Sequence, residues 1–238
     1  MFKQLLLLFA LCLGMGCSTP NLPLSLTYKG YPVNNSTTDT LVLNCVVTRT
    51  GDFSFLVQTA EGIAIYSTTL NVPLPQVDLF TGKGTITVEL DPALAPISTN
   101  NFLSYVNKGF YRGTLFHRVI PNFVIQGGGY TAGLVKQTVQ SAPIELESNK
   151  GLSNVRGSLA MARTNLPNSA TSEFYINLVD NLSLDYKNAA NPGYAVFGKV
   201  VQGMDVADAM ATEPTGVVGG FSDVPLSDIT LSLALQTK

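Results

Sequence analysis

The chain has 238 residues, a length that suits one ordinary domain plus a smaller module. Hydrophobic residues make up 45% of it and charged residues only 13%, so it can bury a core while uncharged polar side chains cover much of its surface. The formal net charge is −2 and there is no dense basic run, which argues against a nucleic-acid partner.

The first residues predict a targeting segment over residues 1–17. Lys3 supplies a positive start, and Leu5–Leu13 form an apolar core that is too short to span a bilayer, since spanning takes roughly 20 residues. Small residues then lead to Cys17, as in bacterial lipoprotein signals, although Gly14 stands where such signals usually have a branched aliphatic residue. We therefore expect a lipid on Cys17 that anchors the protein to the periplasmic side of the outer membrane.

The alternative is an ordinary cleaved secretory signal, which would leave a soluble periplasmic or secreted protein. If Cys17 carries lipid and Cys12 is removed, Cys45 is the only remaining thiol and no internal disulfide is expected. Without acylation, Cys17 and Cys45 are available to form a bridge. Cys45 lies in the apolar run LVLNCVV, a setting typical of a small buried residue.

Residues 18–72 are predicted to form a linker and a small β-rich module of unknown role. The stretch up to about Asp39 is polar and contains prolines. Strands are then expected at Leu41–Val47, Phe53–Val57 and Ile63–Leu70. Pro73 and Pro75 mark the boundary with the larger domain.

The larger domain, expected over residues 76–236, has many short apolar runs and few helical patterns. Apolar residues at helical spacing indicate helices at Ser98–Lys108 and Met204–Ala211. Strands are expected at Val77–Phe80, Thr85–Leu90, Leu115–Ile120, Phe123–Gln126, Ser158–Ala162, Phe174–Leu178, Ala195–Val200 and Ile229–Leu235. Short strands joined by Gly-rich turns predict a mainly β fold, organised as a closed antiparallel barrel.

Two sequence blocks in this domain carry a family resemblance. Residues 114–129 read TLFHRVIPNFVIQGGG, with Arg118 inside an otherwise apolar and aromatic stretch, and residues 157–185 read GSLAMARTNLPNSATSEFYINLVDNLSLD. In this order they resemble the signature of the cyclophilins, the peptidyl-prolyl cis–trans isomerases, over Gln76–Gln236. The resemblance implies a closed antiparallel β-barrel capped by two short helices, an active site on its outer face, and no cofactor.

Prolyl isomerisation breaks no covalent bond. Its barrier, about 18–20 kcal/mol for a peptide bond, comes from the loss of amide resonance as the C–N bond twists. In the twisted state the lone pair of the proline nitrogen is localised, and a fixed donor aimed at it stabilises the transition state more than the planar ground states. An always-charged arginine suits this task, so Arg118 is the candidate donor.

The resemblance also implies roles for the residues around Arg118. Arg118 and Gln126 take the catalytic positions, with the glutamine orienting the arginine and binding the substrate backbone. Phe123 matches the floor of a proline pocket. The full set of implied substrate-binding residues is Phe123, Val124, Ala162, Arg163, Glu173, Tyr175, Leu184 and Tyr194.

Some of these positions depart from the family pattern. Glu173 replaces a glutamine, Ser183 replaces a frequent Trp or Phe, and Tyr194 replaces a frequent histidine. A carboxylate within a few ångströms of Arg118 would pull the guanidinium from its working position, so Glu173→Gln is expected to raise activity. None of these departures removes Arg118.

Other chemistries have less support. His117, the only histidine, lacks the G-x-S-x-G turn of a Ser–His–Asp hydrolase. The glycines at positions 127–129 lack the Lys-Ser/Thr pair of a phosphate loop and indicate a tight turn. A lone histidine without clustered cysteines or carboxylates predicts no metal site.

These observations predict an isomerase of the bacterial cell envelope. It would act on X–Pro bonds in unfolded or partly folded secreted and outer-membrane proteins. The alternative is a proline-binding, chaperone-like lipoprotein with little or no catalysis. Neither a nucleic acid nor a cofactor is expected to take part.

Overall fold

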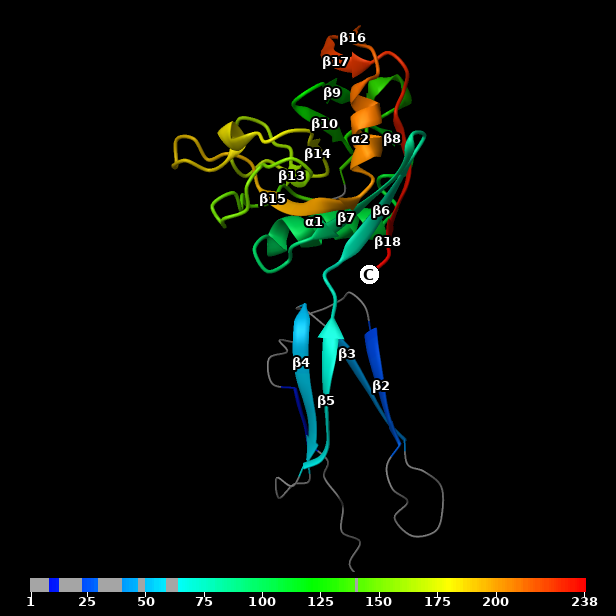
Figure 1. Cartoon of the computed structure of the whole chain (residues 1–238), viewed down its shortest axis with the longest axis vertical. Helices are drawn as coiled ribbons and strands as arrows, with labels where there is room; N and C mark the ends of the chain where they lie inside the picture. The colour runs from blue at the N-terminus through cyan, green and yellow to red at the C-terminus, as the bar shows by residue number, and fades with distance from the viewer. Residues whose placement is uncertain (1–8, 13–22, 30–39, 47–49, 59–63, 140) are drawn as a thin grey trace, which may run out of the picture. The chain divides into compact units, whose positions relative to one another are not determined.

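The structure is a computed structural model that describes residues 9–12, 23–29, 40–46, 50–58, 64–139 and 141–238. The chain divides into two compact units, Met1–Pro73 and Leu74–Lys238 (Figure 1). Cys17, and with it the predicted lipid attachment, lies outside the described residues. Within the described ranges, no helix is long and apolar enough to cross a membrane.

The first unit contains two small antiparallel sheets. Its strands are β1 (Phe9–Cys12), β2 (Pro23–Lys29), β3 (Thr40–Val46), β4 (Gly51–Gln58) and β5 (Ala64–Val72). One sheet has the order β1-β4-β5 and the other pairs β2 with β3. The stretch before residue 40, expected to be a loose linker, therefore contains a strand. Leu24, Leu26 and Tyr28 in β2 alternate with polar residues, a period of two that the surrounding prolines and polar residues obscure.

The second unit is built on one large antiparallel sheet. Its strands are β6 (Gln76–Thr81), β7 (Gly84–Leu90), β8 (Thr114–Leu115), β9 (Arg118–Ile120), β10 (Val124–Gly127), β11 (Tyr130–Thr131), β12 (Val135–Lys136), β13 (Ser158–Met161), β14 (Phe174–Asn177), β15 (Val196–Gln202) and β18 (Thr230–Gln236). Their order across the 11-stranded sheet is β12-β11-β8-β18-β6-β7-β15-β13-β14-β10-β9. The expected strands are present except that Leu115–Ile120 is divided between β8 and β9, and β11 and β12 are additional strands of this sheet.

The sheet is curled but open, so the closed barrel expected from the resemblance is not found. Strands β12 and β9 form its two edges, and no pairing joins them among the described residues. The stretch Leu115–Ile120, which was expected to form one strand, is divided between two parts of the sheet. At its start β8 pairs with β11 and β18, whereas at its end β9 pairs with β10 at the far edge. Phe116 and His117 lie between β8 and β9 and belong to neither strand. The two parts of the sheet are therefore joined here by the chain itself and not by backbone hydrogen bonds between strands.

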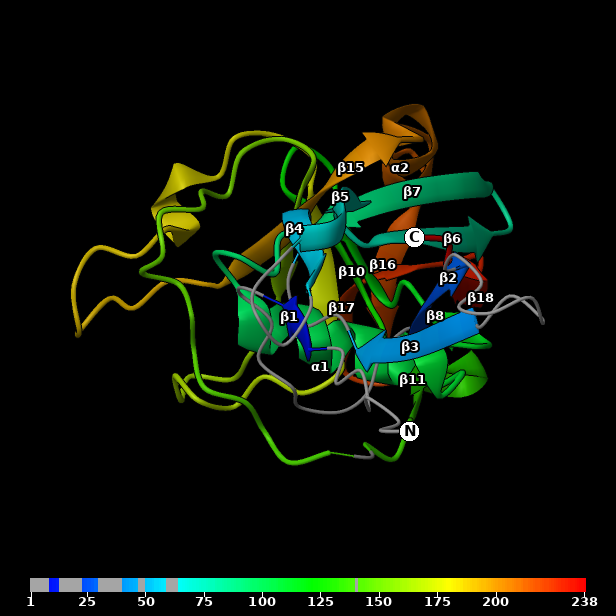
Figure 2. The same ribbon diagram turned by 90° about the horizontal axis from the view of Figure 1, so that it is seen from below.

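Two helices pack on this sheet. α1 (Pro96–Asn107) contacts β15 and β18, and α2 (Met204–Ala211) contacts β7, β9 and β10. Figure 2 shows the two helices on opposite sides of the curled sheet. The core beneath them is rich in buried aromatic side chains: Phe102, Tyr105, Tyr111, Phe116, Phe174 and Phe197. Burial of these large rings, together with the aliphatic residues around them, stabilises the unit.

A carboxylate from a distant loop caps the N-terminus of helix α1. Glu147, only 4% exposed, accepts hydrogen bonds from the backbone N–H groups of Ile97 and Ser98 at 3.0 and 2.7 Å and from the Ser98 hydroxyl at 2.8 Å. An acceptor at a helix N-terminus satisfies N–H groups that have no partner within the helix, and its charge interacts favourably with the helix dipole.

Replacing Glu147 with alanine is expected to lower the free energy of unfolding by about 1.5–3 kcal/mol, because buried donors lose a charged acceptor. Urea denaturation of the full chain measures this loss. The matched control is Glu145→Ala, which removes an exposed carboxylate two residues earlier. Equal unfolding midpoints for the two variants would contradict the capping role.

A separate hairpin that the sequence analysis did not predict follows α2. β16 (Thr215–Val218) and β17 (Phe221–Pro225) pair around Gly219 and Gly220, whose φ angles of 58° and 87° fit the turn that favours two-residue hairpins. The Gly-Gly pair was the available signal for this turn. The hairpin lies against β9, the edge strand that carries Arg118.

Candidate active site

Strands β9 and β10 direct alternate side chains to opposite faces of the sheet. Val119 and Ile125 belong to the main core. Arg118 and Gln126 therefore lie on the other face, where they are direct partners in the strand register. β10 lies between β9 and β14, and Tyr175 is the partner of Gln126 on β14. The pleat thus gathers the polar and aromatic candidates on one outer face.

On this face, polar contacts link Arg118 to His117. Arg118 Nη1 donates to Gln126 Oε1 at 3.4 Å, and Gln126 Nε2 donates to Glu173 Oε2 at 2.9 Å. The same carboxylate oxygen is 3.5 Å from His117 Nε2. A guanidinium only donates hydrogen bonds and an ionised carboxylate only accepts them. The amide of Gln126 is therefore set with its oxygen towards Arg118.

Glu173 does not form the ion pair with Arg118 on which the expected gain from Glu173→Gln depended. Among the described residues its carboxylate contacts His117 Nε2 and Gln126 Nε2, and Gln126 lies between it and Arg118. Gly129 leaves room for this arrangement, because a Cβ there would lie 2.5 Å from the Glu173 carboxyl carbon. The carboxylate holds Gln126 and does not draw Arg118 aside, so the basis for that expected gain in activity is removed.

The pKa of Glu173 lies below its ordinary value of 4.5. Burial raises this pKa, but the hydrogen bond and charge attraction from His117, the hydrogen bond from Gln126 and the charge of Lys136 together outweigh it. A depressed folded-state pKa means that the ionised group stabilises the fold above its unfolded-state pKa. That stabilisation is lost as the pH falls through the folded-state pKa.

We therefore expect the free energy of unfolding to decrease as the pH is lowered below about 4.5, and Glu173→Gln to make this decrease shallower. Urea denaturation at a series of acidic pH values checks it. Glu145→Gln, at an exposed position, is the matched control and is expected to follow the wild type. A Glu173→Gln variant that loses stability as steeply as the wild type would overturn the assignment.

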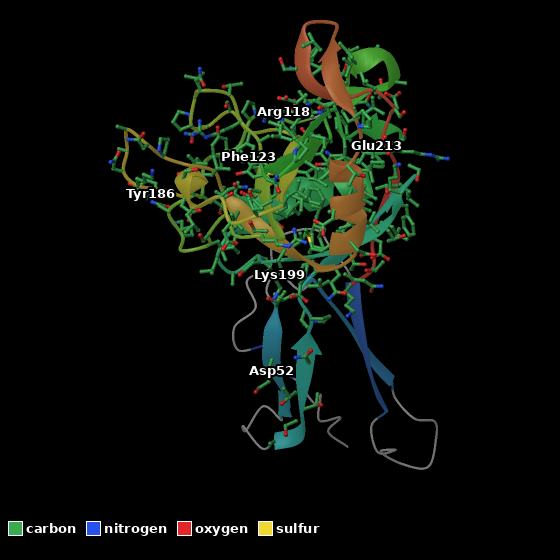
Figure 3. All side chains as sticks on the ribbon, turned by 45° about the horizontal axis from the view of Figure 1, so that its top comes forward. Asp52, Arg118, Phe123, Tyr186, Lys199 and Glu213 are labelled. Carbon is green, nitrogen blue, oxygen red and sulfur yellow. The ribbon has the colours of Figure 1, made fainter. Side chains whose placement is uncertain are left out.

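An apolar cluster on the same face contains most of the predicted pocket residues. Its buried members are Val124, Ala160, Tyr175 and Val196, and the half-buried residues packed against them are Phe123, Leu152, Ala162, Leu184 and Tyr194. This cluster is distinct from the main core. Figure 3 labels Arg118, the first residue of β9, and Phe123, in the turn that leads from β9 into β10. The structure therefore places an apolar surface on the face of the sheet that carries Arg118.

The wall formed by Tyr175 is braced by a buried polar network. Its hydroxyl donates to Asn154 Oδ1 at 2.7 Å, and Asn154 Nδ2 donates to Asp185 Oδ1 at 2.8 Å. Burial raises the pKa of Tyr175, so its hydroxyl stays protonated. Burial also raises the pKa of Asp185, but hydrogen bonds from Ser153 and Asn154 outweigh it and leave that pKa below its ordinary value. The network fixes Tyr175 beside the segment that carries Leu184.

Arg163, which was expected to bind substrate, makes its contacts here within the protein. Its Nε and Nη2 donate to the Gly193 carbonyl at 2.9 and 2.8 Å, and its Nη1 donates to the Thr164 carbonyl at 2.8 Å. Its guanidinium carbon lies 4.5 Å from the ring centre of Tyr194, within the range of a cation–π contact. The side chain thereby fixes Tyr194 at the edge of the apolar cluster.

A cleft of about 420 Å³ lies beside Arg118 and is closed on one side by the β16–β17 hairpin. It is lined by His117, Arg118, Gln126, Tyr130, Glu173, Gly220, Phe221, Ser222 and Asp223. Asp223 Oδ2 is 3.7 Å from Arg118 Nε. The sequence analysis missed Asp223, since only the folded hairpin brings this distant residue to the site. In the part of the chain that the structure describes, no group of His, Cys, Asp and Glu side chains is arranged to hold a metal ion.

Known proteins resemble this chain in both sequence and structure. The family model described as cyclophilin type peptidyl-prolyl cis-trans isomerase/CLD matches residues 76–234. A peptidyl-prolyl cis-trans isomerase of Acinetobacter baylyi is 49% identical over 162 residues, which cover 68% of this chain and 85% of that protein. Peptidyl-prolyl cis-trans isomerase B of Escherichia coli is 46% identical over 157 residues, which cover 65% of this chain and 95% of that protein.

The fold has solved counterparts as well. A crystal structure of a cyclophilin type peptidyl-prolyl cis-trans isomerase from Cryptosporidium parvum, in the presence of the dipeptide Ala-Pro, aligns with a TM-score of 0.58 at 26% identity. The alignment covers 68% of this chain and 99% of that one.

Proposed function

Since this chain belongs to the cyclophilin-type peptidyl-prolyl cis–trans isomerases, we propose that Arg118 is the group with which this enzyme accelerates rotation about X–Pro bonds. The observation that carries the proposal is that Arg118 lies on the same face of the sheet as the apolar cluster, with Gln126 as its register partner on one side and Tyr175 of the cluster as the next partner across β10. Gln126 accepts a hydrogen bond from Nη1, Asp223 lies 3.7 Å from Nε, and among the described residues Nη2 donates no hydrogen bond. Nη2 is therefore available to donate to a substrate.

The mechanism follows from the electronic change at the proline nitrogen. When the imide twists, resonance is lost and the nitrogen lone pair becomes a hydrogen-bond acceptor that the planar forms lack. A donor from Arg118 therefore binds the twisted state more strongly than either planar state, which is the condition for catalysis. The cluster around Phe123 and Tyr175 receives the proline ring and excludes water, which strengthens the hydrogen bond.

The magnitudes show that Arg118 does not act alone. A hydrogen bond to a charged group contributes about 1.5–3 kcal/mol, which corresponds to roughly 10- to 150-fold in rate. Any further acceleration has to come from the apolar cluster, which selects the twisted geometry of the bound peptide. Arg118 and the cluster are thus two parts of one site.

The proposed substrates are proline-containing segments of unfolded or partly folded polypeptides. The Ala-Pro dipeptide present with the Cryptosporidium relative supports this class of ligand. A protease-coupled assay on an Ala-Pro peptide with the full chain tests the proposal, and we expect isomerisation well above the uncatalysed rate. Peptide binding without acceleration would instead identify a proline-binding module, and neither binding nor acceleration would reject the function.

The proposed place of action is the cell envelope, with the protein anchored by lipid on Cys17. The support is the short apolar segment that ends in small residues before this cysteine. Metabolic labelling with a fatty-acid analogue tests it, because the wild type should be labelled and Cys17→Ala should not. Equal labelling of the two proteins, or none in either, would leave the secreted form as the better proposal.

A further inference from the structure

We infer that Asp223, on the hairpin that follows α2, is a positioning residue for Arg118. The inference rests on the proposed function of Arg118. It assigns to β16–β17 a part in catalysis that neither the sequence motifs nor the apolar cluster contains.

The first observation is the geometry around the guanidinium. Asp223 Oδ2 lies 3.7 Å from Arg118 Nε, and Gln126 Oε1 lies 3.4 Å from Nη1. The ion-pair partner and the hydrogen-bond acceptor come from different elements, β17 and β10. Contacts at two of the three nitrogens restrict the orientation of the planar guanidinium and, with it, the direction of Nη2.

The second observation is a β-bulge that places Asp223. Between the two flanking pairs of the hairpin, β16 has the single residue Val217, whereas β17 has two, Ser222 and Asp223. Asp223 has a φ of 61°, in the left-handed region that residues other than glycine rarely adopt. Bulges of this kind redirect a side chain next to a functional site. This one occurs at the residue whose carboxylate contacts Arg118.

The third observation concerns the other charges near Arg118. Glu173 also lines the cleft, but its carboxylate is bound to Gln126 and His117. Among the described residues, Asp223 is therefore the only carboxylate paired with Arg118, and Arg118 is its only ion-pair partner. Both side chains are close to 40% exposed, at 39% and 41%. Ion pairs this exposed are weak, so we expect the contact to orient Arg118 without withholding it from a substrate.

The test uses two substitutions that the left-handed backbone tolerates. Asp223→Asn keeps the shape and removes the charge, and Asp223→Gly removes the side chain without strain. We expect each to lower kcat/KM on an Ala-Pro peptide by about 2- to 5-fold, mainly through kcat, because exposed ion pairs are weak. Asp228→Asn, an exposed carboxylate just beyond the hairpin, is the matched control and should behave as the wild type.

Two further readouts separate positioning from a merely structural role. High salt should reduce wild-type activity towards that of Asp223→Asn while leaving the variant less affected, because salt screens an exposed pair. The ¹⁵N resonance of Arg118 Nε should shift in Asp223→Asn and not in Asp228→Asn. Wild-type kcat/KM in both Asp223 variants, an increase in either, or an unshifted Nε resonance would overturn the inference. A background rate in the wild type would reject the proposed function instead, while the Nε resonance would still report whether Asp223 holds Arg118.

Discussion

Replacing Arg118 with alanine is expected to lower kcat/KM on an Ala-Pro peptide by about 10- to 150-fold, the value of one hydrogen bond from a charged donor. The loss should fall on kcat, because the contact with the twisted nitrogen exists only in the transition state. Arg118→Lys keeps the charge but lacks the planar fork that Gln126 and Asp223 contact, so we expect an intermediate rate. The protease-coupled assay measures all three proteins.

The matched control for Arg118 is Arg112→Ala, which removes an exposed arginine on the segment leading into β8. Its kcat/KM should equal that of the wild type. Arg118 is itself 39% exposed, so its removal should leave the unfolding midpoint almost unchanged. If the wild type is active, a folded Arg118→Ala variant with the same kcat/KM would reject the mechanism.

Replacing Phe123 with alanine should have a comparable effect through the other half of the site. Full burial of one large apolar side chain contributes about 1.5–3 kcal/mol, so losing its contact with the proline ring predicts a decrease in kcat/KM of roughly 10-fold or more. Peptide affinity should fall as well, because the ring contacts the planar forms too. The protease-coupled assay and a direct peptide-binding titration separate these two contributions.

Phe80→Ala provides the matched control for Phe123, since Phe80 is a half-buried phenylalanine on β6, outside the apolar cluster. Both variants lose the same atoms from a half-buried position and should have similar unfolding midpoints. Only Phe123→Ala should lose activity. If the two variants had the same kcat/KM, the cluster around Phe123 would not be the proline pocket.

The sequence predicted most of the second unit because its signals are local. Alternating apolar residues mark strands such as β7, and Met204, Ala207 and Met210 at helical spacing mark α2, whose observed bounds equal the predicted ones. The same alternation separates Arg118 and Gln126 from the core, so the face that carries the candidate site follows from the pattern. The apolar cluster likewise brings together residues that the family resemblance had selected.

What the sequence did not predict depends on contacts between distant segments. The sheet is open, and Phe116 and His117 interrupt a strand that the apolar pattern makes look continuous. Asp223 reaches Arg118 only through a hairpin and a bulge that no periodic pattern reveals. Glu173 was expected to disturb Arg118, yet the folded protein gives it two other partners. In each case the identity of the partner decides the role of the residue.

The segment from β8 to β9 links two distant parts of the curled sheet, so the register of β9 is coupled to that of β8. A shift of β9 by one position would turn the guanidinium inward and expose Val119 in its place. Such a slip would also have to disrupt β8, which is anchored to β11 and β18. Under the proposed mechanism, molecules with a shifted β9 would be inactive as well as unstable. The isomerisation rate of a refolded sample would therefore report the fraction of molecules with β9 in the correct register.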